Sequence, residues 1–159
     1  MDVHVRSLLR KKDGSFTPVR EWEGKLGRSD YLEGALELTV NGVPLITDQI
    51  WDYIDELWVY ILDSLENLAS KGSAFTYFPD QPIKLDMNRI SPSLILMSIS
   101  SKSGKFNNSI QIQEEGFVRN LIDEGENFFV RMQELDPANQ DQYEIEVGRF
   151  KEIRSAYSK

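Results

Sequence analysis

The segment TDQIWDYIDELWVYILDSLENL, residues 47–68, most constrains how this chain can fold. Its apolar residues recur at helical spacing and form one stripe: Ile50, Trp51, Ile54, Leu57, Trp58, Ile61, Leu62, Leu65 and Leu68. A stripe of this width has to pack on another element, so the segment predicts a core helix. The flanking segments predict strands, which makes a sheet the natural surface for this helix to cover.

Two hairpins are predicted before this helix. Residues 3–9 and 16–22 are rich in residues that favour strands, and the turn signal KKDGS joins them. Residues 34–40 alternate apolar and polar side chains and lead into Asn41-Gly42, a pair that suits a type I′ turn because both positions need positive φ. The next four residues, VPLI, predict a short edge strand, since proline cannot donate to a ladder.

The region after the helix predicts four more strands: AFTYF, IKLDMNRI, LILMSIS and SIQIQ, separated by the turn PDQP and polar loops. Residues 114–135 then return to helical spacing, and Gly125 lies on their apolar stripe, where the missing side chain would let another element approach closely. Asp136-Pro137 predicts the start of a last helix. Its shared apolar face comprises Tyr143, Val147, Phe150 and Tyr157.

The order of these elements predicts the α+β class: a largely antiparallel sheet of about five to seven strands, with two to three helices packed on one face. At 159 residues, without repeats or linker-like segments, residues 1–159 are expected to form a single domain. No apolar run approaches the roughly 20 residues that a bilayer requires, and the N-terminus lacks the features of a signal peptide. The sequence therefore predicts a cytoplasmic protein without a membrane partner.

Composition removes several kinds of chemistry. The chain has no cysteine, which excludes disulfides, zinc-thiolate sites and thiol nucleophiles. The only histidine, His4, lies on an apparent edge strand close to the N-terminus, so we expect no Ser-His-Asp triad and no metal site with several histidine ligands. A formal net charge of -8 argues against nucleic acid as a ligand and would attract a basic partner instead.

No motif predicts catalysis. The loop SKSGK resembles a phosphate-binding loop, but Ile99 and Phe106 stand where the first Gly and the Ser/Thr of that motif belong. The carboxylate pairs Glu114/Glu115 and Asp80/Asp86 would suit acid-base or metal chemistry only if they converged in space. We therefore predict no catalytic residues, no metal ligands and no cofactor.

The acidic face of the predicted helix 47–68 is the most unusual feature. It has no Lys or Arg, and its carboxylates lie opposite the apolar stripe: Asp48, Asp52, Asp55, Glu56, Asp63 and Glu66. Two interpretations stay open. The acids either face water or pair with the slightly basic residues 1–29, or they form a docking face for a basic protein. The docking interpretation predicts these partner-binding residues: Asp52, Asp55, Glu56, Val59, Tyr60 and Asp63.

In size, charge and architecture, a small acidic cysteine-free α+β domain is similar in outline to bacterial immunity proteins, which neutralise basic toxins. That resemblance implies a non-enzymatic binding domain with a basic toxin or enzyme as its partner. Two alternatives remain: a structural or scaffold module that self-associates through apolar surface, and a carboxylate-dependent enzyme of unknown substrate. The oligomeric state and the substrate or partner identity are not predicted.

Overall fold

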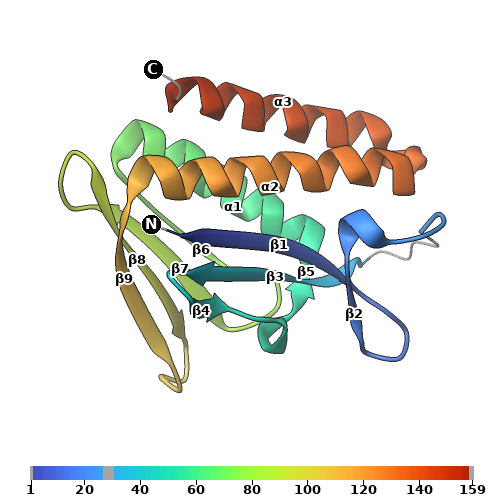
Figure 1. Cartoon of the computed structure of the whole chain (residues 1–159), viewed down its shortest axis with the longest axis horizontal. Helices are drawn as coiled ribbons and strands as arrows, with labels where there is room; N and C mark the ends of the chain where they lie inside the picture. Colours follow the sequence, from blue (N-terminus) through green and yellow to red (C-terminus); the bar gives the residue numbers. More distant parts are fainter. Residues whose placement is uncertain (1, 27–30, 158–159) are drawn as a thin grey trace.

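The computed structural model describes residues 2–26 and 31–157, which form two antiparallel sheets and three α-helices (Figure 1). The predicted α+β class is confirmed. The strands are divided between two sheets, whereas the sequence predicted one, because the long central helix separates the first group of strands from the second.

The first sheet contains the two predicted N-terminal hairpins. Its strand order is β2-β1-β3-β4, and β5 pairs with β3; the bounds are β1 Val3–Arg10, β2 Phe16–Pro18, β3 Glu33–Val40, β4 Val43–Ile46 and β5 Asp52–Tyr53. Asn41 and Gly42 have φ values of 50° and 80°, as the predicted turn between β3 and β4 requires. The predicted strand 16–22 is shorter than expected, since a 3₁₀ helix, η1 (Val19–Glu21), follows Pro18.

The second sheet is a meander in which each strand pairs with the next one along the chain. Its strands are β6 Ser73–Tyr77, β7 Ile83–Arg89, β8 Leu94–Ser101 and β9 Asn107–Gln113. All four strands were predicted. Apolar side chains alternate with polar ones along β7 and β8, so that one face of the sheet is buried and the other carries Lys84, Asp86, Ser98 and Ser100.

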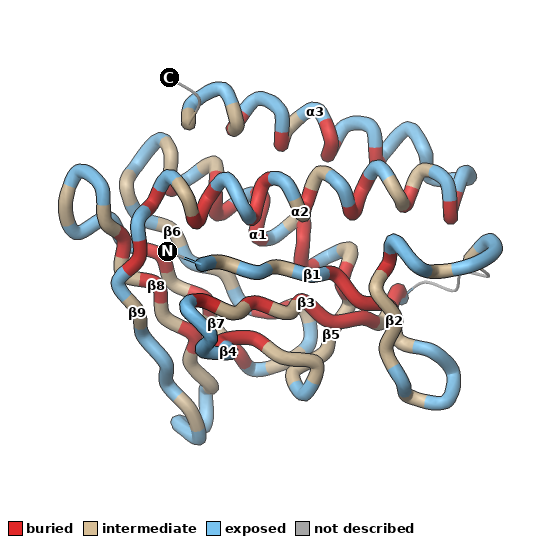
Figure 2. The backbone as a smooth tube through the Cα atoms, in the orientation of Figure 1, coloured by how far each residue is buried: buried red, intermediate tan, exposed pale blue. Residues whose placement is uncertain are grey.

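The helices are α1 (Ile54–Lys71), α2 (Glu114–Leu135) and α3 (Gln140–Ala156), with a short 3₁₀ helix, η3 (Pro137–Asn139), between the last two. In Figure 1, α2 runs across the first sheet beside β1, and α3 lies on the far side of α2 from that sheet. The buried positions of α3 face α2 (Figure 2). This arrangement makes α2 the middle layer between the first sheet and α3.

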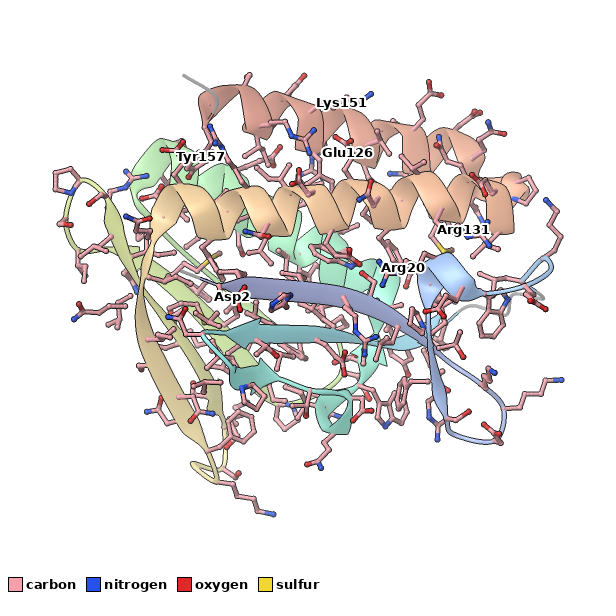
Figure 3. The ribbon with its side chains drawn as sticks, in the orientation of Figure 1. Asp2, Arg20, Glu126, Arg131, Lys151 and Tyr157 are labelled. Atoms are coloured by element: carbon pink, nitrogen blue, oxygen red, sulfur yellow. The ribbon has the colours of Figure 1, made fainter. Side chains whose placement is uncertain are left out.

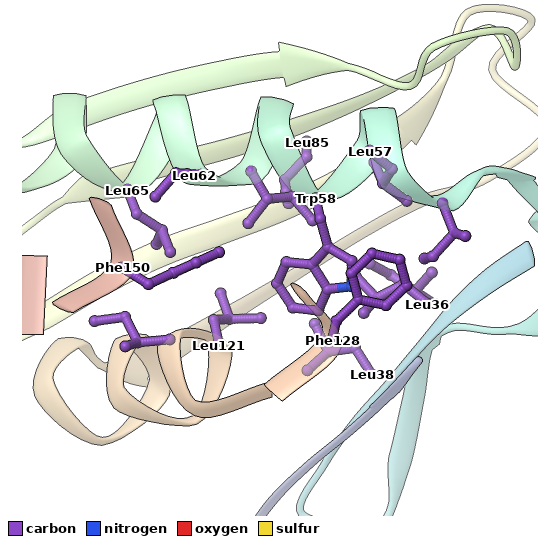
Figure 4. Close-up of a cluster of buried hydrophobic side chains, with 14 of the residues drawn as sticks. Leu36, Leu38, Leu57, Trp58, Leu62, Leu65, Leu85, Leu121, Phe128 and Phe150 are labelled. Carbon is purple, nitrogen blue, oxygen red and sulfur yellow. The ribbon is translucent and has the colours of Figure 1, made fainter. Parts of the chain in front are cut away.

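The three helices meet in an aromatic cluster in the core (Figure 4). The Trp58 ring lies edge-on to Phe150 with ring centroids 6.1 Å apart, and its centroid is 6.5 Å from that of Phe128. Gly125 of α2 lets the Phe150 ring approach this closely, because a Cβ atom on residue 125 would lie 2.3 Å from Cζ of Phe150. The predicted close approach of another element at Gly125 is therefore confirmed.

The central helix begins later than predicted. The sequence pattern predicted helix over residues 47–68, but Asp48–Ile50 form a 3₁₀ helix, Asp52 and Tyr53 form β5, and α1 starts at Ile54. Backbone pairing of β5 with β3 holds residues 52 and 53 extended, and this tertiary pairing outweighs the local helical pattern. Within α1 the predicted apolar stripe is buried from Ile54 to Leu68.

Candidate partner-binding groove

Asp52, one of the predicted partner-binding residues, is a structural residue instead. It is only 2% exposed, and its carboxylate accepts hydrogen bonds from the backbone N–H groups of Tyr53, Asp80 and Gln81 at 2.7 to 3.1 Å. It therefore fastens the turn between β6 and β7 to the start of α1. The prediction that Asp52 belongs to an exposed helical patch is wrong, because the residue precedes the helix and points into the fold.

Replacing Asp52 with Asn tests this structural role. We expect the free energy of unfolding to fall by about 1–2 kcal/mol, because the amide keeps one acceptor oxygen but turns an NH₂ group toward N–H donors. Urea unfolding monitored by circular dichroism measures the loss. The control Asp80→Asn should stay within about 0.5 kcal/mol of the wild type, since only the backbone of Asp80 takes part in these bonds. Equal stability of Asp52→Asn and the wild type would contradict the assignment.

Asp63 and Glu66 are both paired within the fold, to one arginine. Arg149 of α3 donates to Asp63 Oδ1 at 2.5 Å and to Glu66 Oε1 at 2.5 Å, and it also reaches Glu146 at 3.2 Å. These carboxylates hold the pKa of Arg149 above its usual range. The basic partner of these acids comes from the C-terminal helix, whereas the sequence suggested the basic N-terminal region. Arg28 of that region and the nearby Asp30 lie outside the described residues. The interpretation of internal pairing holds for this half of the acidic face.

The other four predicted residues line one hollow between α1 and α3. Asp55, Glu56, Val59 and Tyr60 contribute from α1, and the cavity measures about 180 Å³. The remaining walls come from α2 and α3: Phe129, Gln142, Tyr143 and Glu146. We call these eight residues the acidic groove.

The acidic groove has an aromatic floor under an acidic rim. Phe129 and Tyr143 are buried at its base, whereas Glu56 and Tyr60 are exposed at its edge. Tyr143 is held in place by donating its hydroxyl to Asp136 at 2.6 Å. Such a surface offers apolar contact and negative charge in one groove.

Glu56 is the carboxylate of this rim that is best placed to bind a positively charged ligand. Its side chain forms no hydrogen bond or ion pair with the residues that the structure describes. Burial raises the pKa of Glu56, and the neighbouring charges of Asp55 and Asp52 raise it further. A cation bound beside Glu56 would relieve this repulsion, so the groove favours a positively charged ligand.

Half of the groove was not foreseen from the sequence. Tyr143 was expected on the buried face of the last helix, but nothing local shows that this face meets α1. Glu146 was not singled out, although Gln142 and Arg149, which donate hydrogen bonds to it, stand four residues before it and three after it on the same helix.

The adjacent carboxylates Glu114 and Glu115 turn to different partners, and Asp86 of the other pair considered for catalysis lies 3.6 Å from Lys84. Glu114 binds Arg89 and Tyr157, whereas Glu115 pairs with Arg119 on the helix surface. His4 is exposed and contacts Asp2 at 3.0 Å. Across residues 2–26 and 31–157, no group of three or more His, Asp or Glu side chains is placed to hold a metal ion.

Comparison of the chain with protein family models, curated proteins and solved structures finds no match. In the part of the chain that the structure describes, no helix is both long enough and apolar enough to cross a bilayer. The function proposed below for the acidic groove therefore rests on the geometry of the groove.

Proposed function

We propose that this chain is a non-enzymatic protein-binding domain of the immunity type, which holds a basic toxin or enzyme through the acidic groove. The observation that carries the proposal is an aromatic floor, formed by Phe129 and Tyr143, beside four residues that the sequence already singled out: Asp55, Glu56, Val59 and Tyr60. We place the domain in the cytoplasm, where it would meet such a partner.

The chemistry of the groove fits an Arg or Lys side chain of the partner. The methylene stem of such a residue would pack on Val59 and Phe129, as long basic side chains do on apolar surfaces. Its charged head would reach Glu56 at the rim, with the exposed Tyr60 ring available for cation–π contact. The net charge of -8 would also steer a basic protein toward the surface.

A charge reversal in the groove tests the proposal. We expect an affinity capture with the wild type to retain a basic protein that is lost when Glu56→Lys is the bait. With the recovered partner, Glu56→Lys should slow association about tenfold or more at low salt, because rim charges act mainly on encounter. Tyr60→Ala should instead raise the dissociation rate constant, by a factor that corresponds to about 2 kcal/mol of lost binding free energy if the ring is an anchor.

The matched control is Glu152→Lys, which makes the same charge change on α3 at an exposed residue outside the groove. It should retain the partner as the wild type does. Identical retention by the wild type and Glu56→Lys would contradict the proposal. An increase in mass with added salt, measured by light scattering, would favour apolar self-association instead, since salt weakens contacts between charges.

A further inference from the structure

A second cavity lies on the opposite side of the molecule's middle layer, between β1, η1 and α2. It measures about 190 Å³ and shares no residue with the acidic groove. Its apolar walls are Val5, Pro18, Val19 and Phe128. Its charged lining consists of the carboxylate of Glu124 and the guanidinium groups of Arg6, Arg20 and Arg131. Arg20 and Arg131 are labelled in Figure 3.

Glu124 is fixed in place by the core of the protein. Its Oε2 atom accepts a hydrogen bond of 2.8 Å from the backbone N–H of Ser7. The Ser7 hydroxyl in turn accepts a 3.0 Å hydrogen bond from the indole of the fully buried Trp58. Burial raises the pKa of Glu124, and the Ser7 hydrogen bonds and the charges of Arg20 and Arg6 oppose this shift.

Two of the three arginines are already engaged. Arg131 donates to the carbonyl groups of Val19 and Trp22 and to Glu134, and so it secures η1 to α2. Arg6 pairs with Glu37 across the first sheet at 2.6 Å. Arg20 forms no hydrogen bond or ion pair with any other residue that the structure describes.

Opposite charges therefore face one cavity without touching. Within the described residues, no ion pair joins Glu124 to Arg20 or Arg6, although all three line the same space. A simple anion would be attracted by Arg20 but repelled by Glu124. A simple cation would be attracted by Glu124 but repelled by Arg20. A ligand that carries both charges a short distance apart would engage both groups at once.

We propose that this cavity binds a free α-amino acid with an apolar side chain. Its ammonium group would bind Glu124, its carboxylate would bind Arg20, and its side chain would pack on Val19 and Phe128. The volume of about 190 Å³ suits a ligand smaller than the drug-sized molecules whose sites begin at roughly 300 Å³. This site is independent of the acidic groove and of the function proposed for it.

Titration with L-leucine, L-leucinamide and N-acetyl-L-leucine tests the proposal by isothermal calorimetry. The amide lacks the carboxylate and the acetyl compound lacks the ammonium, so we expect saturable binding of L-leucine and at least tenfold weaker binding of the other two. In the ¹⁵N spectrum, the Ser7 amide signal should shift with L-leucine, because that N–H is bonded to Glu124. Glu124→Gln and Arg20→Gln should each weaken binding of L-leucine tenfold or more.

Both variants, Glu124→Gln and Arg20→Gln, should keep the fold, so that a loss of binding can be assigned to the site. Gln retains the size of Glu124 and an acceptor for the Ser7 N–H, and Arg20 is exposed. The control Asp123→Asn alters the neighbouring residue on α2, which pairs with Arg154 outside the cavity, and should leave binding unchanged. Absence of saturable L-leucine binding at about 10 mM would overturn the proposal. So would equal binding of L-leucine and L-leucinamide, which would show a site for cations alone.

Discussion

Gly125→Ala should destabilise the protein by about 1–2 kcal/mol, although alanine is the better helix former. The added methyl group would lie 2.3 Å from Cζ and 2.7 Å from Cε1 of Phe150, so α3 would have to move or the ring would have to leave its place beside Trp58. Overpacking of this kind costs about 1–3 kcal/mol or more, which outweighs the gain of about 1 kcal/mol in helix propensity. Urea unfolding gives the difference.

The chain supplies a matched control in Gly148, a helical glycine of α3. A Cβ atom there meets nothing within 4 Å, so Gly148→Ala should stabilise the protein by about 0.5–1 kcal/mol. Opposite signs for the two substitutions would show that steric contact with Phe150 decides the result. In the Gly125→Ala background, Phe150→Leu should cost less than it does alone, because the smaller side chain makes room. A stabilising Gly125→Ala would contradict the packing described.

Arg89→Met should cost about 3 kcal/mol at neutral pH. Arg89 binds Glu114 through two hydrogen bonds of 2.7 and 2.6 Å, and it also donates to the carbonyl of Leu68 at the end of α1. The side chain of Glu114 is only 7% exposed. Removing one partner of a buried pair leaves an uncompensated charge, which is more costly than losing the pair as a whole. The double variant Arg89→Met/Glu114→Gln should therefore be more stable than Arg89→Met alone.

The free energy of unfolding that is lost in Arg89→Met should be greater at neutral pH than at acidic pH. The hydrogen bonds from Arg89 lower the pKa of Glu114, the Tyr157 hydroxyl lowers it further, and burial opposes both. A depressed pKa contributes stability that is present above the unfolded value, about 4.3 for Glu, and is lost as the pH falls through the folded value. The difference between wild type and Arg89→Met should thus be largest near pH 7 and shrink below about pH 4. A difference independent of pH would show that Arg89 stabilises by packing alone.

The elements that the sequence predicted well are those with local signals. The Asn41-Gly42 turn, the alternation in β7 and β8, and the stripe of α2 each depend on neighbours within a few residues. The α+β class and the close approach at Gly125 followed from such patterns. The start of α1 did not, because it is set by pairing with β3, which is distant in sequence.

The groove was predicted only in part for the same reason. Helical spacing correctly placed Asp55, Glu56, Val59 and Tyr60 together on α1. Nothing local shows that Asp52 would accept hydrogen bonds from backbone groups 28 and 29 residues later, or that Arg149 would pair with Asp63 from 86 residues away. Because of those two contacts, Asp52 is buried and Asp63 is paired with Arg149, while Asp55 and Glu56 line the groove.

The alternation along the second sheet also protects it from pairing in a wrong register. β7 and β8 are aligned so that Met87 lies opposite Met97 and Leu85 opposite Ile99, all on the buried face. A slip of one residue would turn every side chain of the shifted strand to the other face, burying Ser98 and Ser100 and exposing Met97 and Ile99. Such a slip would lose apolar burial and desolvate hydroxyl groups at once. Neighbouring registers are therefore excluded by the same side chains that form the core.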